Sequence, residues 1–314
     1  MVPPYGRPVQ AKPLARPASS DGVWLAPASL LPMSTSPLRK VQFPDGALAP
    51  ALGLGTWMMG ERGRGANDEA SALSYGVDLG MTLIDTAEMY GDGRAEEIVG
   101  KAIAGRREHV FVVSKVYPHN AGRRAAIAAC ERSLKRLAID QLDLYLLHWR
   151  GRVPLAETVA AFEALRADGR IARWGVSNFD VGDLDELTGL QGGRACAADQ
   201  VLYHLAERGI EKGVLPHARA WPMAVMAYSP FDEGRLLRHP DLVRIAREAQ
   251  VSTATLALAW LVSHDDVIAI PKAARVEHVD AIRAAAGFRL TPDVLAALER
   301  AFPAPKRRTR LAMI

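Results

Sequence analysis

The chain has 314 residues, of which 49% are hydrophobic, and its formal net charge at pH 7 is +4. This length fits two small domains or one barrel of about 250 residues. No apolar run approaches the roughly 18 residues that a membrane span needs. The two cysteines, Cys130 and Cys196, form neither a disulfide framework nor a metal-binding pattern, which fits a cytoplasmic protein without a bound metal.

The excess of positive charge is concentrated at the start of the chain. Five of the 39 basic residues and one of the 35 acidic residues lie in residues 1–40, which leaves 34 of each in residues 41–314. A nucleic-acid surface needs a dense basic patch in a helical or aromatic context, and the balanced body of the chain offers none. We therefore expect neither a nucleic-acid partner nor a membrane partner.

Residues 1–40 are predicted to form a flexible extension. They contain eight of the 20 prolines, with Ser and Ala between them and no hydrophobic periodicity. A targeting peptide is the alternative, but the segment has few Arg for a transit sequence and lacks the apolar stretch of a secretory signal. The folded domain is therefore predicted to span residues 41–314.

Val41 to Pro50 is predicted to form a hairpin through Pro44-Asp45-Gly46 that caps the floor of a barrel. The next stretch, Gly53-Leu54-Gly55-Thr56-Trp57, resembles half of a dinucleotide-binding fingerprint. The third Gly of that fingerprint is replaced by Met58, and no helix opens there, so we exclude a Rossmann domain.

Strand-like and helix-like segments alternate from there on. Short apolar strands are predicted near residues 51–54, 82–85, 110–114, 142–147, 171–176, 196–200, 223–227 and 267–270. Helices are predicted near residues 67–79, 94–104, 123–137, 154–167, 180–188, 212–220, 252–263 and 275–285. Regular alternation at this length calls for an α/β fold with a parallel sheet, and eight units close into a (β/α)8 TIM barrel.

Several boundaries of these elements are marked by local signals. Helix starts are predicted at Asn67-Asp68-Glu69 and at Asp180. Thr291-Pro292 is predicted to begin an extra C-terminal helix outside the repeat, because Pro is favoured in a first turn. The segment from Pro305 to Arg310 is predicted to form a surface strap.

Polar residues follow three successive strands of the predicted barrel. Asp85 ends a short apolar strand, and Tyr90 follows on a turn that contains Gly91 and Gly93. Lys115 and His148 end the next two strands. The carboxyl ends of barrel strands meet at one rim. Because a phenol has a pKa of about 10, a cation near it would lower that pKa, and a carboxylate would hold the cation. The pattern predicts an acid–base site.

The chain resembles the aldo-keto reductase family from about Val41 onward. The resemblance is carried by these segments in order: Gly55-Thr56-Trp57, Asp85-Thr86-Ala87-Glu88-Met89-Tyr90, Ser114-Lys115, Leu147-His148-Trp149, Gly175-Val176-Ser177-Asn178-Phe179 and Ile270-Pro271-Lys272. Within the family, the stretches around His148-Trp149, Asn178-Phe179 and Gln200 to Leu205 are most similar to bacterial methylglyoxal reductases.

The resemblance implies a catalytic tetrad. Tyr90 would be the general acid that protonates a carbonyl oxygen, Lys115 would lower its pKa, and Asp85 would hold Lys115. His148 would orient the carbonyl, while Trp57 and Trp149 would line the substrate pocket with Tyr90. Negative charge develops on oxygen during such a reduction, and a preorganised proton donor stabilises it. The alternative interpretation is that these are structural polar residues at strand ends.

The resemblance also implies NADP(H) as cofactor. Ser177, Asn178 and Gln200 would hydrogen-bond the nicotinamide carboxamide, and Tyr228 would stack on its ring. The expected cofactor-binding set further includes Gly55, Thr56, Trp57, Ser229, Phe231, Lys272, Ala273 and His278. Lys272 would contact the 2′-phosphate near a helix start, where backbone N–H groups favour anions. The chain departs from the family pattern at Ala273, which lacks a hydroxyl, at His278, and at Ala281 and Ile282.

Two functions remain open on the sequence. The first is an NADPH-dependent reductase of small aldehydes and dicarbonyls, acting as a monomer. The second is a nucleotide-sensing NADP(H)-binding subunit in which catalysis is secondary. The complete set of Asp85, Tyr90, Lys115 and His148 favours the enzyme. The physiological substrate cannot be deduced, because one fold and one tetrad serve many chemistries.

Overall fold

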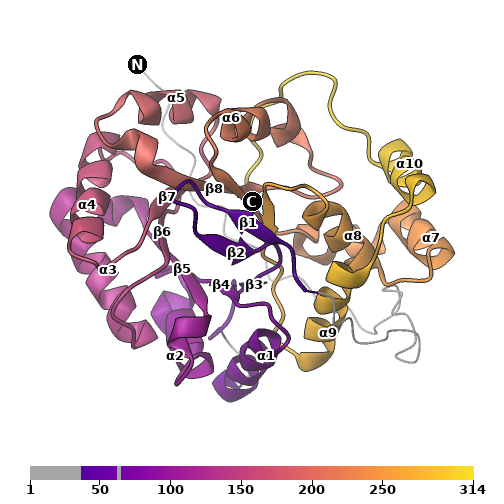
Figure 1. Ribbon diagram of the computed structural model, residues 1–314, viewed down its shortest axis with the longest axis horizontal. Helices are drawn as coiled ribbons and strands as arrows, with labels where there is room; N and C mark the ends of the chain where they lie inside the picture. The colour runs from indigo at the N-terminus through magenta and orange to yellow at the C-terminus, as the bar shows by residue number, and fades with distance from the viewer. Residues whose placement is uncertain (1–36, 62–64) are drawn as a thin grey trace, which may run out of the picture.

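The computed structural model describes residues 37–61 and 65–314 of the chain. Most of the predicted extension, residues 1–36, therefore lies outside the described residues. The described part forms one barrel surrounded by helices (Figure 1). The elements follow the alternation that the sequence predicts, and the fold is the expected (β/α)8 barrel with an N-terminal hairpin.

The strands that build the sheet and the hairpin are short. They are β1 (Lys40–Gln42), β2 (Leu48–Pro50), β3 (Leu54–Gly55), β4 (Leu83–Asp85), β5 (Phe111–Val116), β6 (Leu144–Leu147), β7 (Trp174–Ser177), β8 (Cys196–Leu202), β9 (Ala224–Tyr228) and β10 (Val267–Ala269). Strands β3 to β10 form an eight-stranded sheet in sequence order, and every pair in it is parallel. Parallel bridges from Leu52 to Ala269 and from Gly55 to Lys272 join the first and last strands and close the barrel.

The helices pack around this sheet. They are α1 (Ala66–Asp78), α2 (Arg94–Ala102), α3 (Arg123–Leu137), α4 (Leu155–Ala167), α5 (Val181–Gly189), α6 (Val214–Ala220), α7 (Pro240–Glu248), α8 (Thr253–Val262), α9 (Val276–Ala284) and α10 (Pro292–Ala301). Helix α7 was not predicted. The repeat calls for one helix between β9 and β10, and the predicted helix near residues 252–263, which is α8, already filled that place. Helix α7 begins at Pro240 and buries Leu242, Ile245 and Ala246, which share one helical face.

The predicted helix starts are confirmed in part. Asp180 caps α5 in a capping box, since its side chain accepts from the backbone N–H of Gly182 and of Asp183. Thr291 caps α10, with Pro292 in the first turn. At α1 the prediction was off by two residues, because the N-cap is Gly65 and no side chain caps the helix.

Side chains alternate between two apolar layers along each strand. Leu83, Val113, Leu144 and Ile268 lie in the inner layer, inside the barrel. Their strand neighbours, such as Ile84 and Val112, lie in the outer layer between the sheet and the helices. This alternation fixes which residues point inward at the ends of the strands.

The hairpin closes the floor of the barrel, as predicted. Strands β1 and β2 pair antiparallel and cross the centre of the view in Figure 1. Val41 and Phe43 are buried with the inner layer of the barrel. The ring of Phe43 stacks on that of Phe111 at 5.3 Å, and the Arg173 guanidinium covers both rings. The strand ends that carry Asp85, Lys115 and His148 therefore lie at the other end of the barrel.

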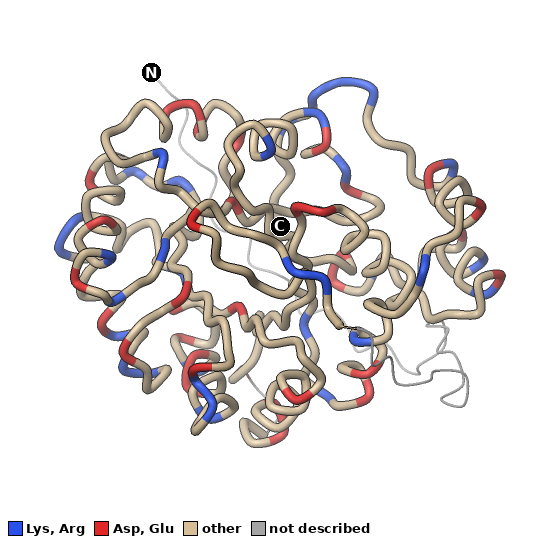
Figure 2. The backbone as a smooth tube through the Cα atoms, in the orientation of Figure 1, with Lys and Arg blue, Asp and Glu red and all other residues tan. Residues whose placement is uncertain are grey.

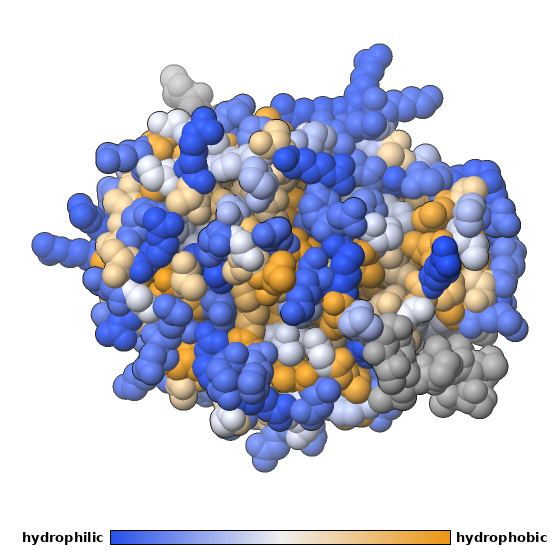
Figure 3. Space-filling view, in the orientation of Figure 1, coloured by the Kyte–Doolittle hydropathy of each residue, from blue (hydrophilic) through white to orange (hydrophobic). Residues whose placement is uncertain are grey.

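Charged residues of both signs are interspersed over the outer helices (Figure 2). The face that carries the hairpin is a mosaic of hydrophilic and hydrophobic patches (Figure 3). Among the described residues, no helix combines the length and the apolar character needed to cross a membrane. The same part of the chain contains no group of His, Cys, Asp and Glu arranged to hold a metal ion.

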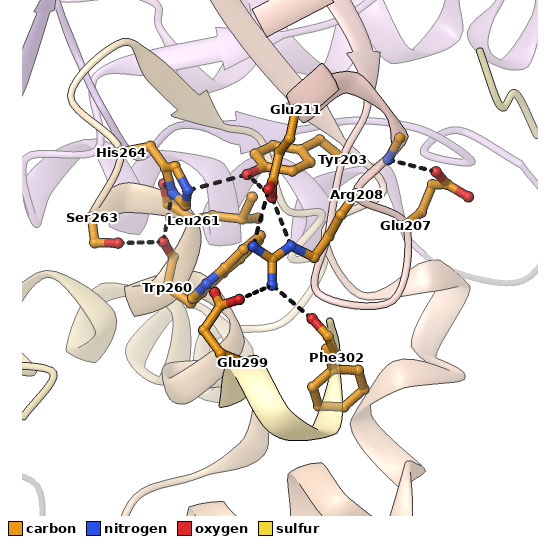
Figure 4. Close-up of polar contacts among 11 residues, drawn as sticks. Tyr203, Glu207, Arg208, Glu211, Trp260, Leu261, Ser263, His264, Glu299 and Phe302 are labelled. Carbon is orange, nitrogen blue, oxygen red and sulfur yellow. Dashed lines mark hydrogen bonds and ion pairs between the residues drawn. The ribbon is translucent and has the colours of Figure 1, made fainter. Parts of the chain in front are cut away.

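A buried arginine connects the loop after β8 to α8 and α10 (Figure 4). Arg208 forms two hydrogen bonds to Glu211, at 2.7 and 3.0 Å, and one to the carbonyl oxygen of Phe302 at 2.6 Å. Its guanidinium lies 5.0 Å from the ring centroid of Trp260. Tyr203 donates its hydroxyl to the same Glu211 carboxylate. This network fastens α10 and the segment after it to the barrel.

Arg39 belongs to the barrel, although the sequence placed it in the extension. Its guanidinium donates to the carbonyl oxygens of Val262, His264, Asp265 and Val267 at 2.5 to 3.2 Å. The carbonyl groups at a helix C-terminus lack partners within the helix. Arg39 therefore caps α8 and anchors the floor hairpin beside it.

We predict that Arg39→Met lowers the free energy of unfolding by about 2–3 kcal/mol, as expected for losing hydrogen bonds to a charged group. Urea denaturation measures this quantity. Arg244→Met is the matched control, because within the described residues Arg244 bonds only to Asp241 and Glu248 of its own helix and such pairs contribute little. Equal midpoints for the two variants would contradict the capping role.

Candidate active site

Five polar side chains reach the inside of the barrel at the carboxyl ends of the strands. Asp85 ends β4, Lys115 lies near the end of β5, and His148 follows β6 directly. Gln200 lies in β8, and Tyr228 ends β9. Each stands two residues after an inner-layer residue, so strand alternation alone points it inward. The parallel sheet brings all five to one rim.

The ammonium group of Lys115 lies at the centre of this rim and is 0% exposed. Its Nζ atom donates to Asp85 Oδ2 at 2.7 Å, to the carbonyl oxygen of Thr86 at 2.9 Å and to Tyr90 Oη at 3.1 Å. Three acceptors match the three N–H groups of an ammonium. Burial lowers the pKa of Lys115, but Asp85 and Tyr90 outweigh that effect, so the net pKa is raised and the group stays charged.

Tyr90 opens a short 3-10 turn (Tyr90–Gly93) and is 7% exposed. Burial raises the pKa of its hydroxyl, the charge of Lys115 lowers it, and the net pKa lies above the ordinary value of 10.0. The expectation of a lowered pKa is therefore right for the contribution of Lys115 and wrong for the net pKa of Tyr90, which burial raises. A phenol with a raised pKa keeps its proton at neutral pH, which suits a proton donor.

His148 lies beside Tyr90, with their ring centroids 5.6 Å apart. Burial, and secondarily the charge of Lys115, lowers the pKa of His148 to about 2. The ring is therefore neutral at physiological pH and carries one N–H donor. Within the described part of the chain, its buried Nδ1 atom has no hydrogen-bond partner.

Two tryptophans flank the tetrad. Trp57 is 43% exposed and meets the Tyr90 ring edge-on, with 5.0 Å between centroids. Trp149 lies beside the His148 ring, with 4.9 Å between the ring centroids, and the His148 ring in turn neighbours that of Tyr90. The rim is thus walled by aromatic rings at the two positions expected for a substrate pocket.

Ser177, Asn178 and Tyr228 form one hydrogen-bonded group next to the tetrad. Tyr228 donates to Asn178 Oδ1 at 2.9 Å, and Asn178 Nδ2 donates to the carbonyl oxygen of His148 and to Ser177 Oγ, both at 3.2 Å. Ser177 in turn donates to the carbonyl oxygen of Gln200 at 2.8 Å. Asn178 has a φ of +61°, a left-handed conformation that Asn tolerates better than most residues.

Gln200 has a contact that the sequence did not predict. Its Nε2 atom donates to Asp85 Oδ1 at 2.8 Å, so the Asp85 carboxylate is held from both sides. The amide nitrogens of Gln200 and Asn178 are thereby engaged, and the capacity that remains on these amides is for accepting. Acceptors beside the flat ring of Tyr228 fit the N–H groups of a carboxamide on a planar ring.

The remaining expected cofactor residues lie around this group. Gly55 and Lys272 face each other across the closing bridge between the first and last strands. A Cβ on Gly55 would lie 2.7 Å from the carbonyl oxygen of Ile270, so the bridge requires glycine. Thr56 is buried, and its hydroxyl donates to the carbonyl oxygen of Asp85 at 3.0 Å.

Lys272 also lines a cavity of about 560 Å³ beside the Tyr90 turn. The guanidinium of Arg94 and the carboxylates of Glu61, Glu69 and Asp92 also line this cavity. Glu69 is buried and accepts the backbone N–H of Gly60 at 2.9 Å.

Four further expected positions lie in the last two repeat units. Ser229 has a φ of +50°, directly after β9, and Phe231 packs against the outer core. Ala273 is buried, whereas His278 lies exposed in the first turns of α9.

The segment after α10 reaches the rim, which the prediction of a surface strap did not include. Residues 303–314 have no regular secondary structure. Leu311 packs against the outer core, and the backbone N–H of Ile314 is hydrogen-bonded to the Tyr228 hydroxyl. Burial, only partly offset by this bond, raises the pKa of Tyr228 to about 12.

Asp199 is a fully buried carboxyl next to Gln200, and no sequence motif marks it. It points to the outer side of β8, opposite Gln200. One oxygen lies 3.5 Å from the backbone nitrogen of Phe179, and the other has no partner among the described residues. Burial raises the pKa of Asp199 well above its ordinary value, which favours the protonated form beneath the Asn178 turn.

A parallel (β/α)8 barrel with a buried Tyr-Lys-Asp group at its carboxyl rim is the framework of an acid–base enzyme. The sequence model of the Aldo/keto reductase family matches residues 51–302. The chain belongs to the aldo-keto reductase family and is an oxidoreductase.

Individual relatives support this assignment. Methylglyoxal reductase YeaE of Escherichia coli is 52% identical over 281 residues, which cover 88% of this chain and 99% of the relative. Glyoxal reductase of Bacillus subtilis is 34% identical over 246 residues, which cover 78% and 86%. An aldo-keto reductase from Klebsiella pneumoniae, crystallised with NADPH, has 50% identity and a TM-score of 0.85, covering 89% of this chain and 100% of that one.

We predict that the His148 ring stays neutral in the folded protein at any pH above about 3, because its pKa is lowered to about 2. NMR of the protein with ¹⁵N-labelled histidine follows the protonation of the ring nitrogens directly. Replacing His148 with Gln identifies its signals. A shift of those signals with a midpoint near 6.5 would contradict the burial argument.

Proposed function

We propose that this protein uses NADPH to reduce compact aldehydes and α-dicarbonyls such as methylglyoxal to alcohols. The observation that carries the proposal is the contact of Lys115 with both Asp85 and Tyr90, at 2.7 and 3.1 Å, inside an aromatic-walled rim. The names of the two relatives above, a methylglyoxal and a glyoxal reductase, support the substrate class.

Tyr90 is the proton donor in this proposal. As a carbonyl is reduced, negative charge develops on its oxygen, and the Tyr90 hydroxyl neutralises it by transferring its proton. Lys115 stabilises the phenolate that remains, since its ammonium lies 3.1 Å from that oxygen. The neutral His148 ring orients the carbonyl oxygen by a hydrogen bond. Asp85 keeps Lys115 charged and in place.

The cofactor site follows from the acceptors at the rim. Gln200, Asn178 and Ser177 would hold the carboxamide of the nicotinamide, and Tyr228 would cover its ring. Lys272 would contact the 2′-phosphate, and the loop through Ser229 and Phe231 would lie over the diphosphate. Bound NADPH supplies the hydride for the reduction. The Klebsiella relative crystallised with NADPH supports this choice of cofactor.

The aromatic rings beside the tetrad support a compact substrate. Trp57 borders the Tyr90 ring and Trp149 borders the His148 ring, so a small carbonyl compound held by Tyr90 and His148 would lie against aromatic side chains. The segment that ends at Ile314 approaches Tyr228, next to the proposed cofactor position. Aromatic walls suit a small carbonyl compound whose reacting oxygen must reach Tyr90 and His148.

We also propose that the protein acts as a cytoplasmic monomer with one barrel domain. Both cysteines are buried as free thiols, and burial raises the pKa of Cys130 to about 12, which keeps it unreactive. The tetrad is complete within one chain. Light scattering after gel filtration measures the mass in solution.

We predict that Tyr90→Phe lowers kcat for methylglyoxal reduction by about 10²–10⁴-fold, the usual effect of losing a general acid. The loss of NADPH absorbance measures the rate. NADPH binding should persist, because the ring remains. Tyr75→Phe is the control, since it removes a hydroxyl bonded to Asp280 on the outer helices. Equal rates in the two variants would remove Tyr90 from the mechanism.

We predict a preference for NADPH over NADH of roughly ten- to a hundredfold, the value of one charge-assisted hydrogen bond to the 2′-phosphate. Lys272→Met should remove most of this preference by weakening NADPH and sparing NADH. Dissociation constants from the quenching of tryptophan fluorescence measure both. Lys101→Met on α2 is the control. Equal weakening of both coenzymes would mean that Lys272 holds the loop and does not contact the phosphate.

A further inference from the structure

An ion pair is buried on the outer side of the barrel, directly behind the tetrad. Glu96 of α2 is fully buried, and its carboxylate meets the Arg136 guanidinium of α3 through two nitrogens, each 2.6 Å from Oε2. The other carboxylate oxygen accepts the hydroxyl of Ser114 at 2.6 Å. One carboxylate thus joins α2, α3 and β5.

Ser114 connects this pair to Lys115. The two residues are neighbours on β5, and strand alternation turns Ser114 outward and Lys115 inward. Both side chains are fully buried. The hydrogen bond from Ser114 to Glu96 therefore fixes the rotation and height of β5 at the point where Lys115 leaves the strand.

Gly93 connects the same pair to Tyr90. The turn that carries Tyr90 ends at Gly93, whose φ of +88° is open to glycine but strained for other residues. A Cβ at Gly93 would lie 2.5 Å from Cδ and Nε of Arg136, so the arginine packs directly on the turn. Helix α2 begins at the next residue, which places Glu96 within its first turn.

We propose that the Glu96–Arg136 pair and Ser114 are positioning residues that set the distance between Lys115 Nζ and Tyr90 Oη. The inference rests on the proposed catalytic roles of Tyr90 and Lys115. One carboxylate acts on both: through Ser114 it holds the strand of Lys115, and through Arg136 it supports the turn of Tyr90. None of the three residues touches the substrate side of the barrel.

The physical reason is the cost of burying a carboxylate. An ion pair out of water contributes little net stability compared with well-packed apolar residues. What the pair supplies is precise positioning of the groups bonded to it, because hydrogen bonds to a carboxylate fix geometry more narrowly than apolar contacts do. A displacement of about 1 Å in a catalytic group can lower the rate by about 10²-fold.

The test uses Ser114→Ala and Glu96→Gln in the full chain. Ser114→Ala removes one hydroxyl and leaves the Glu96–Arg136 pair intact, so it should fold even if Glu96→Gln does not. Glu211→Gln is the matched control. It weakens a comparably buried ion pair, with Arg208, that contacts neither Tyr90 nor Lys115 (Figure 4).

We expect both positioning variants to lower kcat for methylglyoxal by about ten- to a hundredfold, with an unchanged NADPH dissociation constant. The solvent deuterium isotope effect on kcat should increase, because proton transfer from a displaced Tyr90 becomes slower. Glu211→Gln should lower the melting temperature without changing kcat or the isotope effect.

If Ser114→Ala and Glu96→Gln lower only the melting temperature, as the control does, the pair is structural and the inference is wrong. If the unaltered protein does not oxidise NADPH with any small dicarbonyl, the proposed function fails instead. The two failures are distinguishable, because the second concerns the parent protein and the first concerns only the variants.

Discussion

A fully buried ammonium group is the constraint on which the site depends. Lys115 stays charged inside the barrel only because Asp85, Thr86 and Tyr90 accept its three N–H groups. Asp85 in turn needs a second donor, which Gln200 provides from the far side of the barrel. The charge thus ties strands β4, β5 and β8 together at the rim. The amides of Gln200 and Asn178 and the tetrad consequently form one hydrogen-bonded unit.

Much of this arrangement could be predicted from the sequence because it follows from periodicity. Asp85, Lys115 and His148 end apolar strands, and parallel strands bring such ends to one edge. The hairpin was predictable for a similar reason, since Pro44-Asp45-Gly46 has the residues that a tight turn requires. Signals that are local in the chain, or that repeat along it, were sufficient for the fold and for the positions expected at the rim.

Other features depend on contacts between distant segments, and the sequence contained no signal for them. The hydrogen bond from Gln200 to Asp85 spans 115 positions, and no motif around either residue predicts it. The net pKa of Tyr90 is the balance between burial and the charge of Lys115, and its direction requires the buried geometry. Helix α7 was missed because the repeat already had a helix for that unit. Arg39 was placed in the extension because its partners lie more than 220 positions away.

The anchoring of the barrel floor by Arg39 also affects when the floor can form during synthesis of the chain. Because Arg39, beside the hairpin, is synthesised more than 220 residues before the carbonyl oxygens of Val262 to Val267, the floor cannot be fastened during most of synthesis. At about 5–20 residues per second this delay amounts to roughly 10–40 s. Throughout it, Val41 and Phe43 lack the barrel interior that later buries them. The nascent chain therefore presents an apolar hairpin that cellular chaperones could bind, and closure of the floor is a late event in folding.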